Sequence, residues 1–261
     1  MEDESNQPSF HFFSGLLENE PVGTGLDGNF LNEHKYFLQQ MSSLCGKVLF
    51  LVDNHAKEYL YISENADYIL GPLSYQKRNI HGEDVFTSDF FRVQHASSLK
   101  ALIESAQEKL RQYFTKRELL ALSYTIKFDT LTENGEMRSY LQRGKMLYDE
   151  KQGYLPVESG FWLNISHWQK NDMQYFYAKS GNTRIFLKCN PYKNTTAPIR
   201  LSKAQIKVLA ALKQRNNIDE AAHLLNLSKH TLQTHCKHIL NKTEFSSRND
   251  LLNFVIEAGI V

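Results

Sequence analysis

The last 61 residues of this 261-residue chain carry two short helical patterns separated by a tight turn, and the second pattern is amphipathic. On a helix at 100° per residue, the segment 228–243 places its apolar or small residues at i, i+4, i+7 and i+11. These residues are Leu232, Cys236, Ile239 and Thr243. Ser228 precedes the run and is a favourable N-cap. The segment therefore predicts a short helix with a buried stripe on one side.

Three further helices are predicted around it. The segment 219–226 is short and carries small or apolar residues, and the three or four residues before the next helix give helix-turn-helix spacing. Upstream, Ser202 and Gln205 form a capping box of the Ser-x-x-Gln type. Downstream, Ser247 caps a last helix that stops at Gly259.

The side opposite the buried stripe is polar and carries side chains of suitable length to meet base edges. These are His230, Gln233, Thr234 and Lys237. Charge supports this interpretation, because 196–261 contains 9 Lys and Arg against 5 Asp and Glu, whereas 1–195 contains 21 against 24. Since neutralisation of phosphates supplies much of the affinity for DNA, the asymmetry matters more than the overall charge of +1.

Residues 201–261 resemble the DNA-binding domain of LuxR-type transcription regulators. The matching motifs are LS at 201–202, VL at 208–209, AA at 221–222, LS at 227–228, TLQTH at 231–235, Ile239, Lys242 and SSRNDLL at 246–252. Departures from the family pattern are Lys203, Gln205, Asn216, Asn217 and Glu244. The resemblance implies that Gln233, Thr234 and Lys237 reach base edges. Phosphate contacts are expected from Ser228, Lys229, Thr231, Lys242 and Arg248.

The body of the chain predicts strands and helices in another order. A helix over 29–44 precedes a hairpin of 47–53 and 58–63, then two short helices at 64–70 and 83–91 and a long helix over 95–113. Strands follow at 119–130, 137–148 and 157–168, the first two joined through Asn134 and Gly135, a pair typical of a type I′ turn. A last hairpin of 174–178 and 183–188 precedes a linker rich in Pro, Asn and Thr at 190–199.

This order resembles a PAS domain. The expected fold class is α+β: a PAS-like five-stranded antiparallel sheet with flanking helices, plus a small all-α four-helix LuxR-type domain. The expected parts are an N-terminal extension and amphipathic helix (1–45), a PAS-like sensor or dimerisation domain (46–170), a hairpin and linker (171–195) and the DNA-binding domain (196–261).

The inward faces of the predicted strands could line a pocket for a small molecule, although core packing explains the same residues and is preferred. They are Phe50, Tyr61, Tyr124, Phe128, Tyr140, Gln142 and Trp162. No cofactor is expected. No cysteine lies between Cys45 and Cys189 to react with a flavin, and His81 and His95 fit surface positions better than haem ligation.

The sequence lacks the motifs of common enzymes: GxxxxGK, GxGxxG, GxSxG and zinc-ligand spacing. Three widely spaced cysteines indicate a reducing compartment, and neither a signal peptide nor a membrane span is expected, so a cytoplasmic protein is predicted. The expected partners are double-stranded DNA and a second copy of the chain, with RNA polymerase and a small-molecule ligand as further candidates. The alternative is a ligand-binding or interaction module whose helices dock on the transcription machinery without reading DNA.

Overall fold

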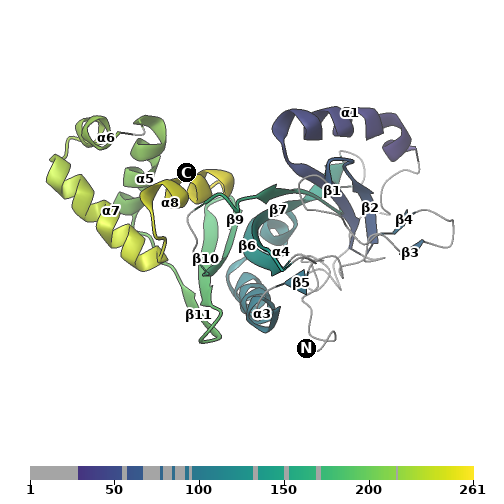
Figure 1. The fold of residues 1–261 in the computed structure, drawn as a ribbon, viewed down its shortest axis with the longest axis horizontal. Helices are drawn as coiled ribbons and strands as arrows, with labels where there is room; N and C mark the ends of the chain where they lie inside the picture. Colours follow the sequence, from purple (N-terminus) through teal and green to yellow (C-terminus); the bar gives the residue numbers. More distant parts are fainter. Residues whose placement is uncertain are drawn as a thin grey trace.

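The computed structural model describes residues 29–54, 58–66, 77–78, 84–85, 92–93, 96–131, 135–149, 153–168, 172–215 and 217–261. A large antiparallel sheet forms its centre, and the C-terminal helices lie at one end (Figure 1). No helix in these ranges is long and apolar enough to cross a membrane.

The longest strands follow the long helix Ala96–Tyr113 in the sequence. Their bounds are β1 (Val48–Asp53), β2 (Glu58–Ile62), β3 (Lys77–Arg78), β4 (Asp84–Val85), β5 (Arg92–Val93), β6 (Ser123–Leu131), β7 (Met137–Asp149), β8 (Gly153–Asn164), β9 (Gln174–Ser180), β10 (Thr183–Asn190) and β11 (Thr195–Pro198). The helices are α1 (Phe30–Cys45), α3 (Ala96–Tyr113), α4 (Lys116–Leu120), α5 (Lys203–Arg215), α6 (Ile218–Leu224), α7 (Lys229–Thr243) and α8 (Arg248–Glu257).

The expectation of a five-stranded PAS-like sheet is wrong. The main sheet has the order β11-β10-β9-β6-β7-β8-β1-β2, and β5 also pairs with β6. The five expected strands are adjacent in it, but β9 pairs with β6 and continues the sheet into β10 and β11. The hairpin at 174–190 is therefore part of the sheet, and strand β11 stands where a linker is predicted.

Smaller differences between the predicted and the observed strands and helices have local causes. The strand expected from Leu119 begins only at Ser123, because Thr115 and Glu118 form a capping box that starts helix α4. Of the two short helices predicted at 64–70 and 83–91, most residues lie outside the described ranges. Within the second, Asp84–Val85 forms strand β4.

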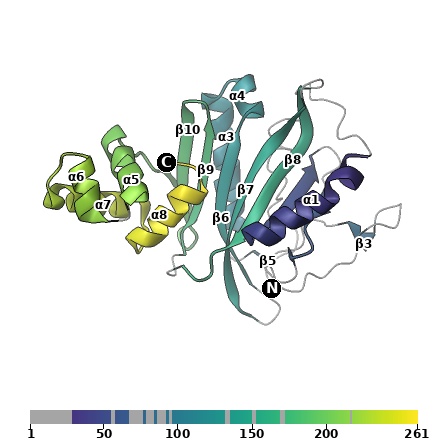
Figure 2. The same cartoon turned by 90° about the horizontal axis from the view of Figure 1, so that it is seen from above.

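The sheet separates two layers of helix, as Figure 2 shows: α3 lies on one side and α1 and α8 on the other. On the α3 side the core contains Leu99, Leu102, Phe128, Tyr140 and Trp162. On the other side two clusters form, one under α1 with Leu51 and Val157, and one under the C-terminal helices. Strand alternation produces the two faces, since successive side chains point to opposite sides.

The C-terminal helices share one core with the sheet. Phe254 of α8 stacks on Phe186 of β10, with 5.6 Å between ring centroids, and lies 5.4 Å from Tyr175 of β9. The Tyr175 hydroxyl donates to the carbonyl of Thr243, at the end of α7, over 2.7 Å. Helix α8 therefore fixes the smaller helical unit to the sheet.

Candidate nucleic-acid interface

Helix α7 has the buried stripe that the sequence predicts. Leu232, Cys236, Ile239 and Thr243 are all buried against the other helices. Ser228 is the N-cap, and its hydroxyl accepts the backbone N–H of Thr231 over 3.0 Å. Burial raises the pKa of the Cys236 thiol, so this cysteine behaves as a small apolar residue in the core.

The turn before α7 is also built locally. Asn217 caps α6 by accepting the N–H groups of Asp219 and Glu220, and α6 ends at Leu224. Asn226 then takes a left-handed backbone conformation, with φ of 52°, which reverses the chain toward Ser228. The predicted capping pair of α5 is confirmed as well: Gln205 N–H donates to the Ser202 hydroxyl, and the Gln205 side chain accepts the Ser202 N–H.

The four residues predicted to meet base edges, His230, Gln233, Thr234 and Lys237, are exposed. They share the side of α7 opposite to the buried stripe. Helix α7 contains no acidic residue. The Thr234 hydroxyl donates to the carbonyl of His230 over 3.0 Å, so these two residues lie one turn apart. In Figure 1 the N-terminal end of α7 lies away from the sheet, whereas its C-terminal end reaches β9 and β10.

A surface groove of about 470 Å³ runs between α7 and the start of α8. It brings together Gln233, Lys237 and Arg248, which the sequence assigns to one interface. The groove also contains Asn241 and Asn249, two amides that can donate and accept hydrogen bonds and that the sequence analysis missed. Asn241 follows Lys237 by four residues, so helical periodicity could have found it.

The five residues predicted to contact phosphates differ in their exposure and in their partners within the protein. Ser228 is exposed and Thr231 half-buried at the start of α7, and Arg248 is half-buried at the start of α8. The Lys229 ammonium pairs with Asp219 over 2.9 Å. The Lys242 ammonium donates to the carbonyl of Arg200 and to the Gln205 side chain, at 3.1 and 3.0 Å, so it also joins α7 to α5.

The predicted small-molecule pocket does not have the predicted composition. Six of its seven residues, Phe50, Tyr124, Phe128, Tyr140, Gln142 and Trp162, are buried on the α3 side of the sheet. Tyr61 lies on the opposite face, in the cluster under α1, because it pairs with Leu51 across β1 and β2. The predicted inward position of Tyr61 is therefore wrong, because the register of β1 against β2 shifts between Leu51 and Val52.

A buried polar chain crosses this inner face. The Trp162 indole N–H donates to the Gln142 carbonyl oxygen over 3.1 Å, the Gln142 amide donates to the Tyr124 hydroxyl over 2.7 Å, and that hydroxyl donates to Glu158 Oε1 over 2.5 Å. Burial raises the pKa of Glu158 to about 8. The sequence gives no signal for Glu158, a single acidic residue in a strand.

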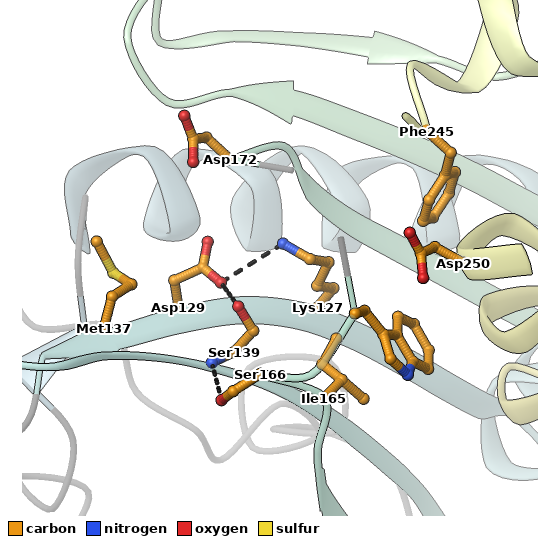
Figure 3. Close-up of a pocket in the computed structure, with 10 residues that line it drawn as sticks. Lys127, Asp129, Met137, Ser139, Ile165, Ser166, Asp172, Phe245 and Asp250 are labelled. Carbon is orange, nitrogen blue, oxygen red and sulfur yellow. Dashed lines mark hydrogen bonds and ion pairs between the residues drawn. The ribbon is translucent and has the colours of Figure 1, made fainter. Parts of the chain in front are cut away.

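A second small pocket lies at the junction of the sheet and the C-terminal helices (Figure 3). The buried Lys127 ammonium donates to the carbonyl of Met173 over 3.0 Å and approaches the Asp129 carboxylate at 3.5 Å. Desolvation lowers the pKa of Lys127, and Asp129 opposes that shift. Phe245 and Asp250 line the pocket from the helical side. In the described parts of the chain, no three His, Cys, Asp or Glu side chains are placed to hold a metal ion.

No family model and no curated protein matches the chain. Among solved structures, the Vibrio cholerae VqmA dimer without target DNA, a LuxR-type receptor, is 12% identical and covers 88% of each chain, with a TM-score of 0.30. The Vibrio cholera VqmA–ligand–DNA complex is 13% identical over 88% of each chain, with a TM-score of 0.30. The phage VqmA–DPO complex is 12% identical over 90% of this chain and 91% of its own, with a TM-score of 0.33. At these TM-scores the similarity establishes neither the fold nor the function of this chain.

Proposed function

We propose that this chain is a LuxR-type, sequence-specific transcription regulator that binds double-stranded DNA through residues 196–261. One observation supports the proposal above all: α7 buries one stripe and leaves His230, Gln233, Thr234 and Lys237 exposed on an acid-free side. An exposed helix of this composition fits the major groove, where amides and ammonium groups recognise base edges.

In this proposal Gln233, Thr234 and Lys237 contact base edges with His230 beside them, while Arg248 at the start of α8 holds a phosphate. Ser228, Lys229 and Thr231 lie at the other end of the same surface and contact the backbone of the DNA. Lys229 and Lys242 have partners within the protein, so their contribution to DNA affinity is smaller than that of Arg248.

Two copies of the chain would place their α7 helices in successive major grooves about 34 Å apart, which requires a roughly palindromic operator. The sheet and its helices then serve as the sensory or dimerising part. RNA polymerase is the partner through which such a regulator would act.

Selection of bound sequences from a random DNA pool tests the proposal. We expect a palindromic consensus, and we expect Lys237→Ala to weaken binding to that consensus by about 1 to 3 kcal/mol. Arg248→Ala should weaken binding to all sequences and reduce the salt dependence of affinity. Lys100→Ala, which removes an exposed charge from α3, is the matched control.

A pool that yields no enriched sequence would contradict the proposal and favour helices that dock on another protein. Equal binding by wild type, Lys237→Ala and Arg248→Ala would contradict the assignment of the interface.

A further inference from the structure

A groove of about 380 Å³ lies on the outer face of the sheet, beside α1. Its lining is mainly apolar: Leu38 of α1, Leu49 and Leu51 of β1, Tyr61 of β2 and Phe161 of β8. Its volume and lining are those of a small-molecule site, since such sites are concave, mostly apolar and carry few polar groups. The groove is on the side of the sheet opposite to α3, and Phe50 of the inner-face core also lines it.

The charged residues of this lining, Arg143 and Lys145 of β7, are both cations. Arg143 and Lys145 occupy alternate positions of one strand, so their side chains point to the same face. Their cross-strand partners are Phe161 and Ser159, which also line the groove. An apolar floor with two adjacent cations selects an amphipathic anion.

Arg143 also reaches the last helix. One of its N–H groups donates to the carbonyl of Glu257, at the end of α8, over 3.0 Å. The Glu257 carboxylate pairs with Lys47 over 2.6 Å, and that ammonium lies 4.1 Å from the centre of the Phe161 ring. The guanidinium has five donors in a planar fork, so it can hold an anion in the groove while it holds α8. A ligand in the groove would thus contact α1, the sheet and Arg143, which donates a hydrogen bond to the end of α8.

We propose that this groove binds a soluble amphipathic monoanion, with an apolar chain or ring on Leu49, Leu51 and Phe161 and its anionic group on Arg143 and Lys145. The binding step does not depend on DNA recognition by α7, and it is measured without DNA.

Three ten-carbon probes that differ only in the head group test the proposal by isothermal titration calorimetry. Decanoate and decylammonium are used below their critical micelle concentrations and decanol below its solubility limit. Decanoate should bind and raise the melting temperature, because a ligand of the folded state stabilises it. Decanol should bind about tenfold or more weakly, since a charge-assisted hydrogen bond is lost. Decylammonium should not bind.

Two substitutions in the groove test which residues bind the probes. Lys145→Gln should weaken decanoate about threefold to tenfold with no effect on decanol. Ser159→Trp places a large ring in the groove and should abolish binding of both probes. Lys100→Gln on α3 removes the same charge elsewhere and should bind decanoate as wild type does.

Equal affinities for decanoate and decanol would overturn the assignment of an anion. Unchanged decanoate binding in folded Ser159→Trp would overturn the site itself, as would the absence of any binding by wild type. Thermal melts of each variant verify that the protein is folded before titration.

Discussion

Glu158 is a carboxylic acid with no exposed surface, held on the inner face of the sheet by the Tyr124 hydroxyl. Burial raises its pKa from an ordinary 4.5 to about 8. Between these values the folded chain keeps a proton that the unfolded chain releases. Stability therefore falls as pH rises from about 4.5 to 8 and levels off above that.

Replacing Glu158 with Gln keeps the shape of the protonated acid and removes the titration. We expect Glu158→Gln to flatten the decline of melting temperature between pH 5 and 8. At pH 8.5 it should melt above wild type by roughly 2 to 4 °C or more, the effect of about 1 kcal/mol in a chain of this length. Differential scanning calorimetry over this pH range measures both effects.

Glu118→Gln is the control for this titration. The hydroxyl of Thr183 and the N–H and hydroxyl of Thr115 lower the pKa of Glu118, so its contribution changes only in acid. Its melting curve above pH 5 should parallel that of wild type. A Glu158→Gln variant with the wild-type slope would show that Glu158 does not titrate in this window.

Among the elements, the helix ends were the most predictable feature, because each depends on residues three apart in sequence. Ser202 with Gln205, Ser228 and Ser247 all cap the helices for which they are predicted. Asn217 is one of the departures from the LuxR-type pattern, so the resemblance does not predict a cap at the start of α6. In the structure the Asn217 side chain supplies the N-cap.

Replacing Asn217 with Ala should cost about 1 kcal/mol of folding stability, because two N–H groups of α6 lose their acceptor. Asn217→Ser restores a capping oxygen and should lie within a few tenths of a kcal/mol of wild type. Urea unfolding followed by circular dichroism measures both. Equal stability of the Ala and Ser variants would mean that the cap contributes nothing.

The sheet was less predictable than the helices, since its order depends on pairs far apart in sequence. Nothing local indicates that β9 pairs with β6 or that Thr195–Pro198 pairs with β10. The outer groove combines Leu38, Arg143 and Phe161, so no single segment contains its signal. The register of β1 against β2 shifts between Leu51 and Val52, so Tyr59 and Tyr61 lie on opposite faces although they are two residues apart, and strict alternation assigns Tyr61 to the wrong face.

At the scale of the whole molecule, the contact between α8 and the sheet joins the C-terminal helices and the sheet in one core. Phe254 is fully buried between Phe186, Tyr175 and Phe245, whose ring centroids lie 5.3 to 5.6 Å from its own. Residues of the sheet and of the helices belong to one cluster there. We therefore expect the helical unit that carries α7 to unfold together with the sheet.

Phe254→Ala should remove about 3 to 5 kcal/mol from this contact and release the helices from the sheet. Hydrogen exchange with mass spectrometry measures this effect on two peptides, for which we expect the same opening free energy in wild type. The peptide 229–243 of α7 should lose far more protection than 137–149 of β7. Phe128→Ala, a fully buried residue on the α3 side, should lower the protection of both equally. Different opening free energies of the two peptides in wild type would contradict the coupling, and so would equal losses in Phe254→Ala.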